Sequence, residues 1–172
     1  MRWAVIILAG LLGACSNAAP KVPASDAAPT RVVSLDYCAA QYVLKMVPRE
    51  HILALSPDAA KAFSYLREAA KGMPTVRPLA EDVIILTPDL VVRSYGGGPD
   101  AQRFFEGANI PVVNVGWAND LEGVKRVTQD LADALGVPEI GEAMNADFDA
   151  RLAALPAPSG RSALYVTPSG VT

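Results

Sequence analysis

Short apolar runs rich in β-branched residues alternate with amphipathic segments along most of this chain. The runs predict strands covered on both faces, because apolar residues are not interrupted by a solvent-facing alternation. They occupy 31–35, 51–55, 89–92 and 111–115. Segments with helical character lie between and after them, at 37–46, 66–70, 79–86, 100–109 and 120–135. This order predicts an α/β fold with a parallel sheet and helices on both faces.

A longer helix is predicted near the carboxyl end, from Glu139 to about Leu155. At a rise of ~1.5 Å per residue it would span ~25 Å, the width of a small domain. A new strand is predicted over 162–166, and 167–172 is predicted to be a loop. Since this strand has neither a following helix nor a partner, we expect a second structural unit that is incomplete, either in a sequence fragment or after an early stop.

The opening residues have the pattern of a bacterial lipoprotein signal. Arg2 gives a thin positive region, Trp3 to Leu12 are apolar, and Leu12-Gly13-Ala14-Cys15 matches a lipobox. The alternative, a transmembrane anchor, needs ~20 apolar residues, which is more than this stretch supplies. We therefore expect a signal peptide over 1–15, lipid on Cys15, a flexible tether over 16–29 and a membrane-anchored protein in the periplasm, on either membrane.

Composition narrows the class of partner. The chain has 172 residues, 51% of them apolar, and a net charge of −3. No basic cluster is present in the sequence to neutralise phosphates, which argues against a nucleic-acid partner. If Cys15 carries lipid, Cys38 has no partner for a disulfide; it is then either a small buried apolar residue or a thiol that touches a ligand.

Aromatic residues follow each of the predicted strands. They are Tyr37, Tyr65, Tyr95 and Trp117. In an open α/β sheet the carboxyl ends of the strands line the ligand crevice, so these rings predict a pocket for a large and partly flat molecule. Alternatively, the rings of Tyr37 and Tyr65 only cover the edge of the sheet.

The loop after the third strand has the sequence Arg93-Ser94-Tyr95-Gly96-Gly97-Gly98. Its glycines, Gly97 among them, allow the bare backbone to approach a ligand. Arg93 has two interpretations, a structural ion pair with a neighbouring carboxylate or a forked contact with an anionic group of the ligand.

The order of several short segments resembles one known family. The segments are Arg31-Val32-Val33-Ser34-Leu35-Asp36, Leu53-Ala54-Leu55-Ser56, Leu86-Thr87-Pro88-Asp89-Leu90-Val91-Val92 and Ile110-Pro111-Val112-Val113, followed by the long helix. They are similar to the iron-siderophore and vitamin B12 periplasmic binding proteins of ABC importers. The resemblance implies two lobes that grip a ligand: an amino-terminal lobe over 30–138, an inter-lobe helix over 139–157, and the start of a truncated second lobe over 158–172.

The resemblance also implies a function and a set of site residues. Members bind metal chelates such as ferric siderophores, haem or cobalamin, catalyse no reaction, use no cofactor and deliver the ligand to an ABC permease in the inner membrane. We expect a monomer. Asp36 and Tyr37 match the first cleft loop, the segment through Tyr65 the second, Arg93 to Gly98 the third and Trp117 the fourth. The permease would meet Asp100 or Glu81, although each carboxylate would also suit the amino end of its own helix.

Two other classes compete with this interpretation. Gly96, Gly98 and Ala101 fit the G-x-G-x-x-A form of a dinucleotide-binding turn, but the turn follows the third strand and the next strand lacks the acidic residue that holds a ribose. His51 is the only histidine, which argues against a catalytic triad and against direct metal binding by side chains. The remaining alternative is a lipoprotein adaptor or sensor that kept the lobe and lost transport.

Overall fold

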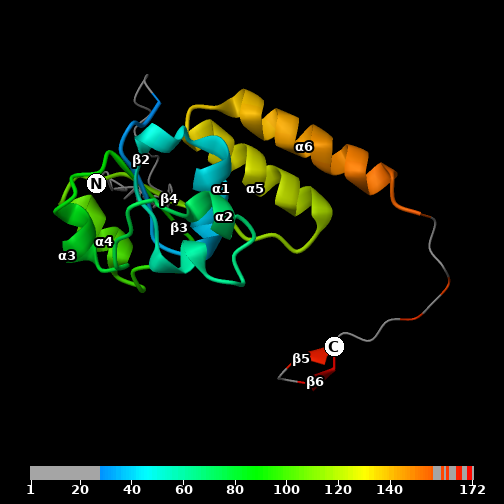
Figure 1. The fold of residues 1–172 in the computed structure, drawn as a ribbon, viewed down its shortest axis with the longest axis horizontal. Helices are drawn as coiled ribbons and strands as arrows, with labels where there is room; N and C mark the ends of the chain where they lie inside the picture. The colour runs from blue at the N-terminus through cyan, green and yellow to red at the C-terminus, as the bar shows by residue number, and fades with distance from the viewer. Residues whose placement is uncertain (1–27, 157–159, 161, 163–165, 168–169, 172) are drawn as a thin grey trace, which may run out of the picture.

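The computed structural model describes residues 28–156, 160, 162, 166–167 and 170–171 (Figure 1). The predicted signal peptide, the lipid site at Cys15 and most of the predicted tether lie outside the described residues. Among the residues that are described, no helix is both long enough and apolar enough to cross a membrane.

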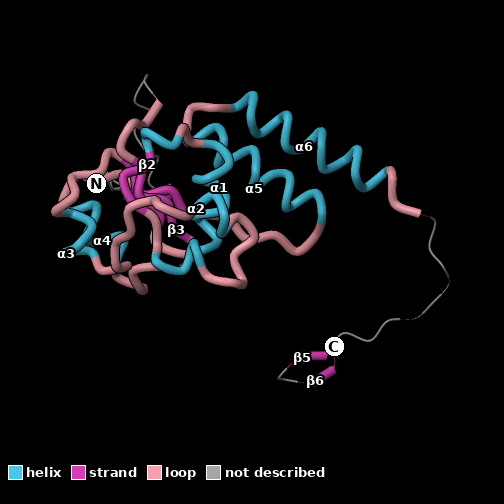
Figure 2. The backbone as a smooth tube through the Cα atoms, in the orientation of Figure 1, coloured by secondary structure: helices cyan, strands magenta, loops and turns pink. Residues whose placement is uncertain are grey.

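A parallel sheet forms the centre of the molecule, as the alternation of apolar runs predicts (Figure 2). It has four strands in the spatial order β2-β1-β3-β4. The strands are β1 (Val32–Ser34), β2 (Ile52–Ala54), β3 (Leu90–Arg93) and β4 (Val112–Asn114). The chain therefore runs from β1 outward to β2, and returns past β1 to place β3 and β4 on the other side.

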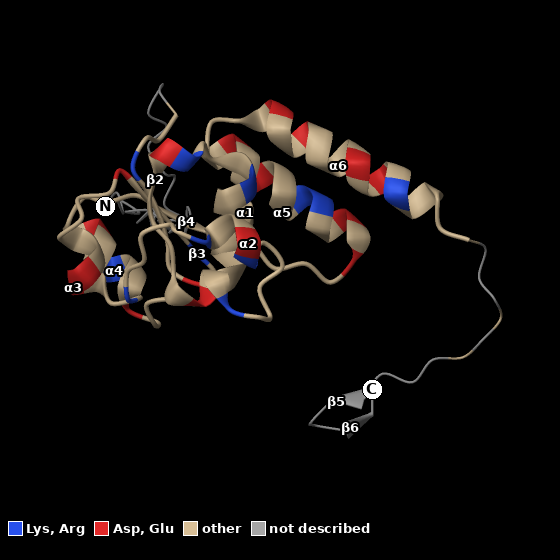
Figure 3. Ribbon diagram, viewed as in Figure 1, with Lys and Arg blue, Asp and Glu red and all other residues tan. Residues whose placement is uncertain are grey.

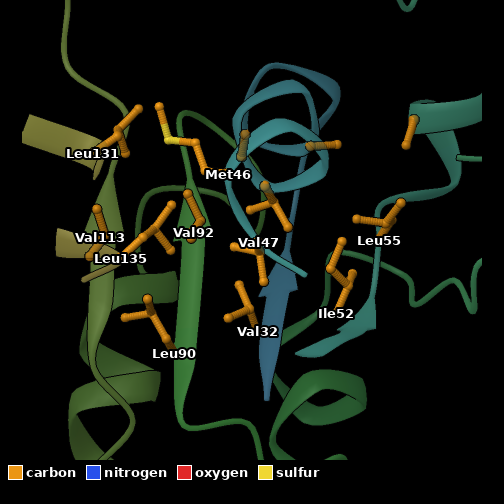
Figure 4. Close-up of a cluster of buried hydrophobic side chains, with 14 of the residues drawn as sticks. Val32, Met46, Val47, Ile52, Leu55, Leu90, Val92, Val113, Leu131 and Leu135 are labelled. Carbon is orange, nitrogen blue, oxygen red and sulfur yellow. The ribbon is translucent and has the colours of Figure 1, made fainter. Parts of the chain in front are cut away.

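One face of the sheet is covered by α1 (Tyr37–Met46) and α5 (Leu121–Ala134). Val32 and Val92 point toward this face and pack with apolar residues of the two helices (Figure 4). Successive strand residues alternate between faces, so every second valine joins this cluster. The side chains labelled in Figure 4 are Val32, Met46, Val47, Ile52, Leu55, Leu90, Val92, Val113, Leu131 and Leu135.

The opposite face is covered by two short helices, α3 (Ala80–Ile84) and α4 (Ala101–Gly107). Val33 and Val91, the neighbours of the residues that face α1, pack here with the fully buried ring of Phe105. The two clusters confirm the prediction that helices cover both faces.

The long helix α6 (Pro138–Ala153) lies beside α5 (Figure 1). Lys125 Nζ on α5 contacts Asp149 Oδ1 on α6 at 3.0 Å, and the Asn145 amide donates to the Lys125 carbonyl oxygen at 3.0 Å. The helices approach closely at Gly141, where an added Cβ would lie 2.6 Å from the Cβ of Ala132. Acidic and basic residues are interspersed along the described part of both helices (Figure 3).

Several helices are shorter than the sequence predicts. The segment predicted over 79–86 is helical only to Ile84, and the one predicted over 100–109 only to Gly107. In each case the chain then adopts a left-handed backbone conformation that a continuing helix excludes, at Thr87 (φ 49°) and Asn109 (φ 57°). The remaining short elements are η1 (Arg49–His51), η2 (Pro57–Ala60) and α2 (Arg67–Ala70).

The carboxyl-terminal prediction needs a correction. Thr167 to Thr172 were predicted to form a loop after an unpartnered strand, but β5 (Val166–Thr167) pairs antiparallel with β6 (Gly170–Val171). A strand of two residues is too short to show an alternating apolar pattern, and the proline, serine and glycine of this segment are residues that favour turns. The predicted strand residues 163–165 lie outside the described residues.

Candidate functional site

The candidate site lies at the carboxyl ends of β1 and β3. These strands are neighbours in the sheet, but the chain leaves β1 toward β2 and leaves β3 toward β4. In open α/β sheets, the strand ends at which the connections diverge in this way are where ligands bind. The loop that follows β1 and the glycine loop that follows β3 meet at this point.

Asp36, which follows β1, connects the loop after β1 to the glycine loop from the interior of the protein. Its side chain is only 1% exposed and caps α1, where Oδ1 accepts a hydrogen bond from the Ala39 N–H at 2.9 Å. The same carboxylate accepts the N–H groups of Ser94 at 2.7 Å, Tyr95 at 3.2 Å and Gly96 at 3.0 Å, and the Ser94 hydroxyl at 2.8 Å. The structure thus places Asp36 beneath the site and not at its surface, which does not suit the predicted direct contact with a ligand.

Hydrogen bonding keeps the Asp36 carboxylate charged. Burial alone would raise the pKa of Asp36, because it disfavours the ionised form. The N–H groups of Ala39, Ser94 and Gly96, with the Ser94 hydroxyl, outweigh burial and hold the pKa below its ordinary value. At neutral pH the loop is therefore held by charge-assisted hydrogen bonds, which are stronger than neutral ones.

The glycine loop lies directly on the end of β1. A Cβ added at Gly96 would stand 2.3 Å from the Leu35 carbonyl oxygen, and one at Gly97 would stand 2.7 Å from the Cβ of Ala101. Gly97 also has a φ of +84°, which L side chains rarely adopt. Neither position has room for a side chain, so the glycines permit close packing of the loop against its own lobe.

Arg93 is the last residue of β3 and is 7% exposed. Its Nη2 donates to the Gly98 carbonyl oxygen at 2.9 Å, and its Nε is buried without a partner. Within the described residues it forms no ion pair, so the carboxylate partner considered from the sequence is not found there. Arg93 supports the far end of the glycine loop, and its contact with an anionic ligand group stays a prediction.

The structure gathers three aromatic rings at this site. The Tyr37 ring packs edge-to-face against Phe63, with centroids 5.2 Å apart, and lies 6.3 Å from the Tyr95 ring. Phe63 is 64% exposed and Tyr95 is 56% exposed, which is unusual for rings of this size. We call Tyr37, Phe63 and Tyr95 the aromatic row.

Phe63 was not predicted as a site residue. It lies in an irregular segment that is held to α1 by Gln41. The Gln41 Nε2 donates to the Ser64 hydroxyl at 2.6 Å and to the Tyr37 carbonyl oxygen at 3.2 Å, while Oε1 accepts the Leu66 N–H at 2.7 Å. The available signal was an aromatic residue beside a serine in the segment after the second strand.

The other two predicted aromatic residues are placed apart from this row. Tyr65 is 85% exposed and lines a separate groove of about 300 Å³ between α1 and α6. Trp117 is 86% exposed, and its Nε1 donates to the Asn119 side chain at 2.6 Å. No aromatic pair that involves either ring occurs among the described residues. The groove is lined by Gln41, Tyr42, Lys45, Tyr65, Leu66 and Met144.

The phenol groups of the aromatic row favour their neutral form. The pKa of Tyr37 is raised mainly by its neighbour Cys38, and less by burial and by the charge of Asp36. The pKa of Tyr95 is raised by burial and then by the charges of Asp36 and Cys38. At neutral pH both phenols can donate a hydrogen bond and present an apolar ring to a ligand.

Cys38 and the two predicted docking residues are found at or near the surface. Cys38 is half-buried and unpaired, more accessible than a fully buried apolar residue. Asp100 precedes α4 without capping it through its side chain, and contacts Arg103 at 3.5 Å. Glu81 is exposed in the first turn of α3. The surface position leaves both carboxylates available to a partner, which stays a prediction.

The donor chemistry of the site suits binding. Among the described residues, no group of three or more His, Cys, Asp or Glu side chains is placed to hold a metal ion. The site offers aromatic faces, phenol hydroxyls and a backbone loop that is fixed from below. Such a surface can stack on a flat or apolar molecule and orient it with a few hydrogen bonds.

Comparison with known proteins identifies the same architecture. No protein-family model and no curated protein matches the chain. A periplasmic haem-binding protein from Pseudomonas aeruginosa is similar, with 28% identity, a TM-score of 0.60, and coverage of 73% of this chain and 45% of that one. The periplasmic haem-binding protein RhuT from Roseiflexus sp. RS-1 shows 26% identity and a TM-score of 0.61, with 72% and 48% covered.

A third comparison extends the likeness of fold. The periplasmic vitamin B12 binding protein BtuF of Vibrio cholerae has 18% identity and a TM-score of 0.56, with coverage of 73% of this chain and 49% of that one. The chain thus spans about half the length of these solved structures, which corresponds to a single lobe. These similarities fit the iron-siderophore and vitamin B12 family of periplasmic binding proteins, and the chain has the fold of one lobe of such a protein.

Proposed function

We propose that this chain is the ligand-binding lobe of a substrate-binding lipoprotein of an ABC importer. It captures a metal chelate, a ferric siderophore, haem or cobalamin, and delivers it to a permease in the inner membrane. The observation that carries the proposal is the aromatic row at the point where the sheet connections diverge, in which Phe63 and Tyr95 are exposed and Tyr37 is half-buried between them. The similar proteins named for haem binding support the ligand class.

The chemistry of the row explains the choice of ligand class. The exposed rings of Phe63 and Tyr95 offer apolar area that a flat or aromatic molecule can cover. Aromatic contacts add about 0.5–1.5 kcal/mol beyond the area that they bury. Because one lobe supplies only one wall, we expect the chain alone to bind weakly, since tight sites bury most of a ligand's surface. The protein acts by binding and release, without covalent chemistry.

Lipid on Cys15 would anchor the protein to one of the two membranes that border the periplasm, within reach of the permease. Asp100 and Glu81 are both exposed, on helices that cover the same face of the sheet, which suits contact with basic residues of that partner. A double charge reversal, Glu81→Lys with Asp100→Lys, should abolish ligand uptake in cells and leave ligand binding by the purified protein unchanged. Uptake that persists in this variant would exclude these residues from docking.

Ligand titration tests the proposal directly. The full chain, purified in mild detergent, is titrated with haemin, cyanocobalamin and ferrichrome, while visible absorbance and tryptophan fluorescence are recorded. One of the three chelates should bind, and Phe63→Ala should weaken that binding. Ile85→Ala, which removes another exposed apolar side chain, at the end of α3, is the matched control and should bind as the unchanged protein does. Failure of all three chelates to bind the folded chain would contradict the proposal.

A further inference from the structure

The amino end of α1, with its capping residue Asp36, holds both loops that carry the outer rings of the aromatic row, Tyr95 and Phe63. Asp36 holds the glycine loop with Tyr95, and Gln41 holds the segment with Phe63. We propose that Asp36 and Gln41 are positioning residues, which set ligand affinity by fixing the row before a ligand arrives and without touching the ligand. This inference rests on the proposed function and names the residues on which the binding surface depends.

The burial of Asp36 decides between contact and positioning. A side chain that is 1% exposed cannot present a carboxylate to a ligand without rearrangement of the lobe. Its Oδ2 collects the N–H groups of three consecutive residues, Ser94, Tyr95 and Gly96. Because these donors point inward to one oxygen, the backbone conformation that directs the Tyr95 ring outward is fixed by Asp36.

Gln41 has the same role toward the second loop. Its amide uses both ends, with Nε2 donating to the Ser64 hydroxyl and Oε1 accepting the Leu66 N–H. Ser64 is fully buried, so the residues on either side of it are directed outward. One of them is Phe63, whose ring then rests against Tyr37. Tyr37 lies between Asp36 and Gln41 in the sequence, and thus packs between the two loops that they hold.

A simpler alternative is that these contacts only stabilise the fold. Two kinds of variant separate the alternatives. In Asp36→Ser the new side chain can still cap α1 but is too short to reach the glycine loop. Val43→Ala removes buried apolar volume from the same helix and leaves Asp36 and Gln41 unchanged. If only stability matters, both variants should behave alike. If position matters, only Asp36→Ser should affect the loop.

Amide hydrogen exchange of the full chain gives a readout without any ligand. We expect Asp36→Ser to speed exchange at residues 94–96 by about tenfold or more, because each lost hydrogen bond of about 1.4 kcal/mol corresponds to a factor of ten. Exchange at Ala39, which the serine cap still protects, should change far less. Gln41→Met, which keeps the volume and removes the hydrogen bonds, should speed exchange at Leu66 and provides a second variant should Asp36→Ser not fold.

Titration with the chelate that binds the unchanged protein completes the test. Asp36→Ser and Gln41→Met should each weaken binding about tenfold, which corresponds to the loss of one charge-assisted or well-placed hydrogen bond that fixes the row. Val43→Ala should bind within about twofold of the unchanged protein. Unchanged exchange at residues 94–96 in Asp36→Ser, or faster exchange with unchanged affinity, would overturn the inference. If none of the chelates binds the unchanged protein, the proposed function fails, while the exchange data still report whether Asp36 and Gln41 fix the loops.

Discussion

Asp36 and Asp120 begin two helices with almost the same local geometry. Their backbone angles are −148°/169° and −146°/173°, and each side chain accepts a hydrogen bond from the N–H three residues ahead. Asp120 is exposed, and that cap is the only hydrogen bond of its carboxylate that the structure shows within the described residues. Asp36 is buried and also holds a loop some 60 residues away. A helix-capping aspartate therefore stabilises only its own helix at α5, whereas the one at α1 also fixes the glycine loop of the candidate site.

Alanine at these two positions should give the largest contrast. Asp36→Ala removes a cap and leaves the buried N–H groups of the glycine loop without their acceptor, which should lower the free energy of unfolding by about 3 kcal/mol. Asp120→Ala loses only a cap, at about 1 kcal/mol. Urea unfolding monitored by circular dichroism measures both. Equal losses would mean that the loop contacts add nothing to stability.

The contact of the glycine loop with β1 should give the next effect. Gly96→Ala forces a Cβ against the Leu35 carbonyl oxygen, so the loop must shift away from Asp36, and the free energy of unfolding should fall by about 2 kcal/mol. Gly107→Ala, at a position in α4 with open space around the added Cβ, should instead stabilise by about 0.5 kcal/mol. Thermal unfolding of the two variants distinguishes steric conflict from a general effect of replacing glycine. A neutral Gly96→Ala variant would show that the loop is free to move.

Acid should remove the advantage of Asp36. Since its pKa is lower in the folded state than in the unfolded state, its charge contributes stability that is complete above the ordinary aspartate range and is lost as the pH falls through the folded-state pKa. The difference in unfolding free energy between the unchanged protein and Asp36→Asn should stay constant above about pH 5 and shrink below about pH 4. A difference that is independent of pH would contradict a role for the charge.

The smallest expected effect concerns the Tyr95 phenol. Burial raises its pKa most, and the negative charge of Asp36 raises it further. Asp36→Ser should therefore move the alkaline transition of this tyrosine partway back toward its ordinary value, whereas Asp120→Ser should leave it in place. Near-ultraviolet absorbance, recorded during an alkaline titration, follows the phenolate. An identical transition in both variants would show that Asp36 does not act on Tyr95 through its charge.

The sequence predicts the scaffold better than the site. The apolar runs around Val33 and around Val92 indicate buried strands directly, and the helix over Tyr37–Met46 begins and ends as predicted. These features depend on local pattern. The bonds of Asp36 to residues 94–96 join segments 58 to 60 positions apart, and no local pattern encodes such a pairing.

The aromatic residues show the same limit. Each was expected at the strand ends, but only Tyr37 and Tyr95 pack as neighbours, because α1 and the glycine loop bring them together. Trp117 follows β4 at the edge of the sheet, beyond β3. Phe63 packs against Tyr37 because Gln41 binds the neighbouring Ser64. Its segment has no periodic pattern that would indicate which ring faces the site.

The positioning of the aromatic row by Asp36 and Gln41 also has a consequence for the rate of ligand binding. Both act within a single lobe, so the aromatic surface exists at the moment of first encounter and no loop has to order before a ligand can attach. Association would then proceed at the rate of collision and orientation, and any second wall that closes afterward would act mainly on the lifetime of the complex. Changes at Asp36 or Gln41 should accordingly slow capture, while changes in an opposing lobe should speed escape.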